Sequence, residues 1–164
     1  DSGTLATDSV TAAKLEASAI TVGDLPAGSV LQVVQGTLAT ISTSTSTTYI
    51  DTGLTATITP TSSSSKILAT VSAPARINHT AINSALRLQL LRGASVISIF
   101  ANYVGWNSES SGYTQETSSI SLLDSPASTS ALIYKVQFRS ETTNNVSVCH
   151  DSSVASITLM EIAG

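Results

Sequence analysis

Alternating apolar and polar residues run through most of the chain after residue 28. In the segment 85–91, Leu86, Leu88 and Leu90 alternate with Arg87 and Gln89. Successive side chains of a β-strand point to opposite faces, so this pattern predicts a strand with one face in the core. Similar runs separated by turn-forming residues predict strands at 30–34, 54–59, 66–73, 85–91, 96–103, 118–123, 132–139, 146–148 and 153–162.

Many short strands at this spacing, with almost no helical periodicity, are typical of an antiparallel sandwich or barrel. We therefore expect an all-β fold in which residues 29–164 form an antiparallel, jelly-roll-like β-sandwich head. The last strand carries Ile157, Leu159 and Glu161 on one face and Thr158, Met160 and Ile162 on the other. Because both faces hold large apolar side chains, we expect one face to pack on the core and the other on a neighbouring subunit.

The first thirty residues contain a repeat of ten residues. Cut at every tenth residue, they read GTLATDSVTA, AKLEASAITV and GDLPAGSVLQ. Large apolar residues recur at its third and eighth places, namely Leu5, Leu15 and Leu25, and Val10, Ile20 and Val30. So few large apolar side chains do not offset the ordering entropy of a single chain. Residues 1–28 are therefore predicted to form an oligomerisation stalk of parallel copies; the alternative is a disordered Ser/Thr/Ala linker.

The composition also indicates a partner. Only 11% of the 164 residues are charged, whereas average domains carry about 25%. Ser and Thr make up about a third of the chain. We expect these residues, together with neighbouring subunits, to cover the surface. Parallel stalks favour cyclic symmetry over a two-fold axis.

The same numbers exclude several classes of protein. Seven Lys and Arg residues against eleven Asp and Glu residues, without a basic cluster, argue against nucleic-acid binding. The apolar stretches are shorter than the roughly 20 residues of a membrane helix, so no membrane insertion is expected. The single Cys149 forms no intrachain disulfide and is predicted to be a buried thiol. Since the chain begins at Asp1 without a Met or a signal segment, we expect it to be part of a longer protein.

Particular stretches of the chain resemble a known family. They are DSVTAAKL, SAITVGDL, LPAGSVLQVVQ, TYIDTGLTATITPTSSSSKILATVSA, ALRLQLLRGASVI and the ending SITLMEIAG. They are similar to the distal stalk-and-head region of bacteriophage tail fibres and related virion appendages of the cyanophage and marine-phage type. The resemblance implies a homotrimer with an intertwined stalk and jelly-roll heads, as in tumour-necrosis-factor-like trimers, located in the virion beside other tail or fibre proteins.

Little in the chain suggests catalysis or metal binding. Nucleophilic hydrolysis needs a Ser or Cys beside an oriented His, and only His79 and His150 are present. In Cys149-His150-Asp151 the neighbours are expected to point to opposite faces. One chain offers too few ligands for zinc, although His79 or His150 near a three-fold axis would be repeated three times. We expect no cofactor, no resident metal and no catalytic residues.

Glycan cleavage would need two carboxylates about 5 to 9.5 Å apart. Glu109 and Glu116 lie after Trp106, and Asp124 follows the next apolar run. Their Ser-rich surroundings do not suggest the desolvation that raises the pKa of a general acid.

The segment 105–115, GWNSESSGYTQ, is the best candidate for a ligand-binding loop. It contains the only Trp of a chain with 4% aromatic residues, and Tyr103 precedes it. Aromatic faces beside amide and carboxylate groups suit the stacking and hydrogen bonding of sugars. We predict that Trp106, Asn107, Glu109 and Tyr113 contribute to glycan recognition; the alternative is that Trp106 anchors the loop in the sandwich or in a subunit interface.

These observations lead to one expected function and two alternatives. The expected function is that of a virion structural protein, a trimeric tail-fibre tip that binds host cell-surface polysaccharide and is not an enzyme. The first alternative is a purely structural virion component, such as a capsid decoration or fibre segment. The second is a polysaccharide depolymerase tip.

Overall fold

The computed structural model describes residues 21–80, 82–106 and 111–164 of the chain. The described part contains the 3-10 turn η2 (Val22–Asp24) and ten strands. The strands are β1 (Val30–Leu38), β2 (Ser42–Ser44), β3 (Ile50–Ile58), β4 (Lys66–His79), β5 (Leu86–Arg92), β6 (Ser95–Val104), β7 (Gly112–Asp124), β8 (Leu132–Ser140), β9 (Val146–Val148) and β10 (Ala155–Ile162). The protein is therefore all-β, as the alternating pattern predicts, and within the described ranges no helix is long and apolar enough to cross a membrane.

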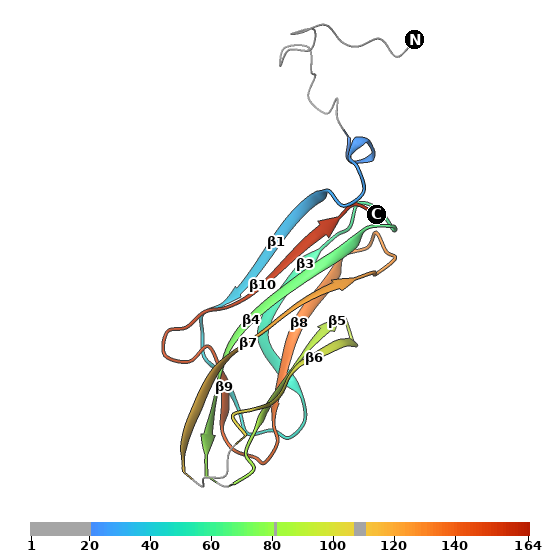
Figure 1. The fold of residues 1–164 in the computed structure, drawn as a ribbon. Helices are drawn as coiled ribbons and strands as arrows, with labels where there is room; N and C mark the ends of the chain where they lie inside the picture. Colours follow the sequence, from blue (N-terminus) through green and yellow to red (C-terminus); the bar gives the residue numbers. More distant parts are fainter. Residues whose placement is uncertain (1–20, 81, 107–110) are drawn as a thin grey trace, which may run out of the picture.

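The strands form two antiparallel sheets (Figure 1). The first sheet has the order β1-β10-β4-β9-β2, and β7 pairs with the free edge of β4. The second sheet has the order β3-β8-β5-β6. The strand pairs are nested along the chain: β1 pairs with β10, β3 with β8, β4 with β7 and β5 with β6.

The core lies between the two sheets and follows the predicted periodicity of two. Leu86, Leu88 and Leu90 are fully buried, and so are Ile157 and Leu159 on the opposite sheet. Side chains from both sheets join in one cluster, with Tyr134 and Phe138 among the largest buried members. The prediction that the faces of these strands differ in burial is therefore confirmed.

Strand β4 is much longer than the predicted strand 66–73, because it continues through Pro74. β4 continues to His79 and pairs with β7 over this whole length. On its other edge, β10 pairs as far as Ser72 and β9 begins at Ala75. The Pro74 carbonyl on this edge accepts a hydrogen bond from the Cys149 amide, 3.0 Å away. The missing N–H of Pro74 therefore lies at the gap between two partner strands, where no ladder bond is lost.

Part of the predicted ligand-binding loop is also strand. β7 begins at Gly112, so Tyr113 and Gln115 pair with Asn78 and Arg76 of β4. The prediction of a loop over 105–115 was wrong for these positions, because the long partner β4 offers ladder hydrogen bonds that the local sequence does not reveal. Asn107 and Glu109 lie outside the described residues.

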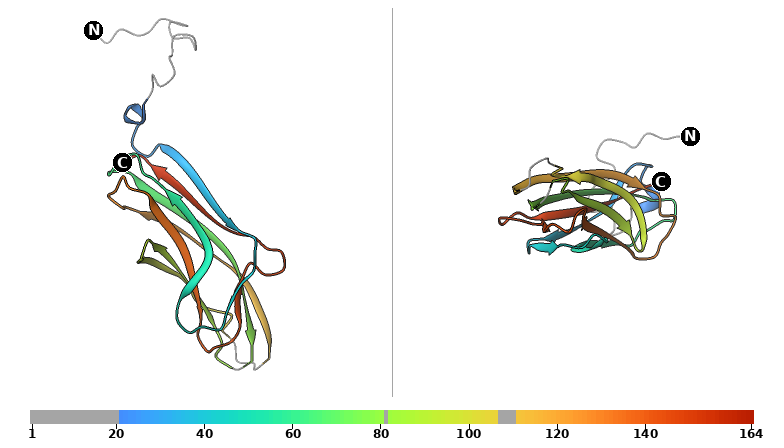
Figure 2. Two further views of the ribbon diagram at one scale, coloured as in Figure 1. Left: turned by 180° about the vertical axis from the view of Figure 1, so that it is seen from behind. Right: turned by 90° about the horizontal axis from the view of Figure 1, so that it is seen from below.

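The start of the head and the C-terminus lie together at one end of the sandwich (Figure 2). The Gly28 amide donates to the Ala163 carbonyl and the Ala163 amide to the Ser29 carbonyl, both at 2.8 Å. Leu25 and Val30 of the predicted stalk positions are 39% and 53% exposed, whereas Leu5, Val10, Leu15 and Ile20 lie outside the described residues. We call this the proximal end; the opposite end, where β4 and β6 finish and β7 begins, is the distal end.

Candidate functional site at the distal end

The turn after β6 presents two aromatic rings to solvent. Tyr103 and Trp106 form an edge-to-face pair with ring centroids 5.3 Å apart and planes at 88°. Their side chains are 42% and 53% exposed. Trp106 is therefore not anchored in the sandwich core.

Local backbone geometry explains why Trp106 points outward. Tyr103 and Gly105 have positive φ angles of 63° and 70°, and the Trp106 amide donates to the Tyr103 carbonyl at 3.2 Å. A Cβ atom on Gly105 would lie 2.4 Å from Cγ2 of Ile77 in the core. The chain therefore needs glycine at this position, both for its φ angle and for its contact with the core.

Charged side chains lie beside Tyr103 of the aromatic pair. The Arg87 guanidinium carbon lies 4.2 Å from the Tyr103 ring centroid, a cation–π contact. Arg87 Nε and Arg139 NH2 each lie 2.8 Å from Oε2 of Glu141. Two guanidinium groups share one carboxylate, so this cluster carries a net positive charge beside the rings.

The aromatic pair lines an open, mostly apolar hollow of about 310 Å³. Among the described residues only Tyr103 and Trp106 line it. An exposed aromatic ring face with charged hydrogen-bonding groups nearby can hold the ring face of a sugar and orient its substituents.

Tyr113 belongs to a different cluster from Trp106. It is 62% exposed, and the Arg76 guanidinium carbon lies 4.4 Å from its ring centroid. Arg76 Nε in turn donates to Asn78 Oδ1 at 2.9 Å. The sequence suggested one aromatic loop, whereas the structure places Tyr113 against Arg76 and pairs Trp106 with Tyr103.

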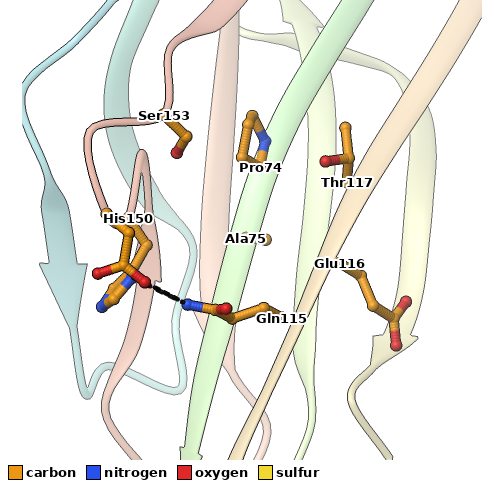
Figure 3. Close-up of a pocket in the computed structure, with 8 residues that line it drawn as sticks. Pro74, Ala75, Gln115, Glu116, Thr117, His150 and Ser153 are labelled. Carbon is orange, nitrogen blue, oxygen red and sulfur yellow. Dashed lines mark hydrogen bonds and ion pairs between the residues drawn. The ribbon is translucent and has the colours of Figure 1, made fainter.

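A second hollow, of about 340 Å³, lies beside β4 between β7 and the turn after β9 (Figure 3). Gln115 extends toward that turn, where its amide nitrogen lies 2.9 Å from Asp151 Oδ2 and 3.0 Å from His150 Nδ1. Arg76 also contacts the His150 ring. The hydrogen bond from Gln115, followed by the contact with His150, lowers the pKa of Asp151, so this carboxylate is ionised at neutral pH.

The structure separates Glu116 from Asp124, two of the carboxylates considered for glycan cleavage; Glu109 lies outside the described residues. Asp124 lies eight residues beyond Glu116 on β7, about 26 Å along an extended strand. Asp124 accepts hydrogen bonds from Arg92 at 2.5 Å and Tyr134 at 2.6 Å. Asp124 therefore pairs with the half-buried Arg92 and the buried Tyr134 at the proximal side of the sandwich.

His79 and Cys149 are buried in the fold. His79 is 4% exposed, and its Nε2 lies 2.9 Å from Thr114 Oγ1. Cys149 is buried, and its thiol donates to the Leu38 carbonyl at 2.9 Å, so it does not face His150 as a nucleophile would. In the described parts of the chain no group of three or more His, Cys, Asp or Glu residues is placed to hold a metal ion.

The alternating pattern of the sequence did not reveal that Arg87, Arg139 and Glu141 belong to the candidate site. Arg87 and Arg139 are directly paired across β5 and β8, and Glu141 follows β8. The sequence showed only that Arg87 and Arg139 occupy polar positions of two alternating strands. The pairing of β5 with β8 brings the two residues together.

A comparison with protein-family models gives no match, and a comparison with curated protein sequences gives none either. The function proposed below therefore depends on the geometry of the head and on the resemblance described above.

Proposed function

We propose that this chain is the stalk-and-head region of a trimeric bacteriophage tail fibre or related virion appendage, and that the distal end of its head binds a host cell-surface glycan. We further propose that the head is a jelly roll of the tumour-necrosis-factor-like kind. The strands pair in nested order: β1 with β10, β3 with β8, β4 with β7 and β5 with β6. This order supports the jelly roll.

The observation that carries glycan binding is the exposed Tyr103–Trp106 pair beside Arg87. The rings offer apolar stacking surface, while the guanidinium and the nearby carboxylate offer donors and acceptors to hydroxyl groups. The pair lies at the end of the head remote from residues 28 and 29, where a stalk would join. A fibre attached by its N-terminal side would present this end to a cell.

Trimerisation would make weak binding sufficient. We expect modest affinity from a single open hollow lined, among the described residues, by two aromatic side chains. Three such sites on one rigid tip, and several fibres on one particle, would convert weak contacts into stable adhesion through effective concentration.

The proposal is tested by measuring binding of the 164-residue chain to an array of purified bacterial lipopolysaccharides and capsular polysaccharides. We expect Trp106→Ala to weaken binding to the recognised glycan at least tenfold, with unchanged thermal unfolding. Trp106→Phe, which keeps a stacking face, should retain most of the binding. Tyr113→Ala serves as the aromatic control from the other cluster.

Four outcomes would change the proposal. Unchanged binding by Trp106→Ala would remove the Tyr103–Trp106 pair from the site. Loss of binding by Tyr113→Ala alone would move the site to the Arg76 cluster. Absence of binding across the array would favour the purely structural alternative, and release of reducing ends would favour the depolymerase.

A further inference from the structure

The outer face of the first sheet contains an apolar row that crosses four strands. The register places Val33 of β1 beside Met160 of β10, Met160 beside Leu68 of β4, and Leu68 beside Leu123 of β7. Their neighbours along each strand point into the core, so these four side chains point outward. Val33 and Leu123 are 57% and 51% exposed.

The next two rows on this face are polar but uncharged. One consists of Gln35, Thr158, Thr70 and Ser121, and the other of Thr37, Ser156, Ser72 and Ser119. Hydrogen bonds within the first of them link Gln35 to Thr158 at 3.1 Å and Thr70 to Ser121 at 3.4 Å. We call the three rows together the uncharged face; Lys66 and Arg76 bound it along β4.

The outer face of the second sheet is different. Lys135 pairs with Asp51 at 3.0 Å, and Arg87 and Arg139 pair with Glu141. A chain with only 11% charged residues thus places several of them on one sheet and none on the three rows of the other. Such a face offers a charged partner no charge complementarity, whereas two copies of it meet without like-charge repulsion.

The direction of the chain indicates how copies would meet. Residues 28 and 29 are hydrogen-bonded to Ala163 at the proximal end, beside the apolar row. If copies are joined by parallel stalks, rotation about an axis along the stalk keeps each row at the same height. Each apolar row then meets the apolar row of another copy, and each Ser/Thr row meets its equivalent.

We propose that the uncharged face is the surface through which copies of this chain associate around a common axis, with the row Val33, Met160, Leu68 and Leu123 as its apolar contact. This inference rests on the parallel assembly in the proposed function and adds which face of the head lies inward. The charged outer face of the second sheet and the Tyr103–Trp106 pair then remain outside the contact.

The test compares single substitutions on the two sheets of the full 164-residue chain. Val33→Glu and Leu123→Glu place a charge in the apolar row at positions that are exposed in one chain. Ile133→Glu is the matched control, because Ile133 is 51% exposed on the outer face of the second sheet. Light scattering over a dilution series gives the concentration at which the assembly dissociates, and circular dichroism checks the fold.

We expect the two row variants to dissociate at a concentration at least tenfold higher than the parent, and Ile133→Glu to behave as the parent. A short bis-maleimide should link copies carrying both Val33→Cys and Leu123→Cys, at the two ends of the row, but not copies carrying Ile133→Cys. An assembled parent whose row variants dissociate at the same concentration as the parent, or whose doubly substituted copies do not link, would overturn the inference and leave the assembly intact. A parent that is a single chain at every concentration would overturn the assembly itself.

Discussion

The side-chain amide of Gln32 donates a 2.6 Å hydrogen bond to the carboxylate of Glu161, although 129 residues separate the two along the chain. The Thr61 amide and hydroxyl each donate to the other carboxylate oxygen at 2.7 Å. Glu161 is fully buried, so these bonds replace its hydration. One carboxylate thereby ties the first strand, the turn after β3 and the last strand together at the proximal end.

This network predicts a specific pH dependence of stability. Burial of Glu161 alone would raise its pKa, but the hydrogen bonds from Gln32 and Thr61 outweigh burial and hold the pKa at about 2. Because the pKa is lower in the folded than in the unfolded chain, the stabilisation is complete above about pH 5 and is lost as the pH falls toward 2. Glu161→Gln should lower the free energy of unfolding at pH 7 by about 3 kcal/mol.

Urea unfolding of the parent and of Glu161→Gln at a series of pH values measures this effect. The difference between the two proteins should shrink steadily between pH 5 and pH 2. Glu116→Gln, at an exposed carboxylate, is the control and should leave stability unchanged. A difference between the parent and Glu161→Gln that is the same at pH 7 and pH 2.5 would contradict the predicted role of Glu161.

A second prediction concerns the close contact between β1 and β3. A Cβ atom on Gly36 would lie 1.9 Å from the Thr55 carbonyl oxygen, which is part of the backbone and cannot rotate away. Gly36→Ala should therefore destabilise the head by about 3 kcal/mol through overpacking. Thermal unfolding measures the loss; Gly23→Ala, whose new Cβ would be 3.7 Å from its nearest neighbour, should show little change. Equal melting temperatures for both variants would show that β1 and β3 are not in close contact.

Cys149 provides a third prediction. Burial raises the pKa of its thiol, and a protonated, enclosed thiol is a poor nucleophile. In native protein at pH 7 we expect its reaction with an aromatic disulfide reagent to be about a hundredfold slower than in urea. A Thr57→Cys variant, at an exposed position, should react rapidly at its added thiol. Rapid reaction of native Cys149 would instead support a reactive thiol.

The fourth prediction tests the proposed division of the chain into stalk and head. Deleting residues 1–28 removes the bond from the Gly28 amide to Ala163 but keeps the bond from Ala163 to Ser29. One backbone hydrogen bond contributes about 1 kcal/mol, so the head should still unfold cooperatively, with its melting temperature lowered by about 4 °C. If copies assemble as proposed, light scattering should show weaker assembly of the shortened chain. An aggregated, unfolded product would show that the deleted segment is part of the core of the head.

Part of the candidate site was readable from the sequence, and part was not. Trp106 stood out as a single Trp near Tyr103, and the two do form an exposed pair. Tyr113 looked equally close, yet β7 begins at Gly112 and Tyr113 packs against Arg76. Nearness along a chain does not decide which face of which strand a side chain occupies, because the partner strand sets where the ladder begins.

The sequence by itself determined most of the strands and their buried faces, since the alternation around Leu88, Val136 and Leu159 is a local consequence of the pleated backbone. It did not predict β2 or the start of β7 at Gly112. Only the tertiary structure decided that β4 runs past Pro74, that Gln32 meets Glu161, and that one apolar row crosses β1, β10, β4 and β7. These features depend on pairings between residues tens to more than a hundred positions apart. Such pairings are selected by the closure of the whole sandwich around one core, and no local pattern of apolar and polar residues specifies them.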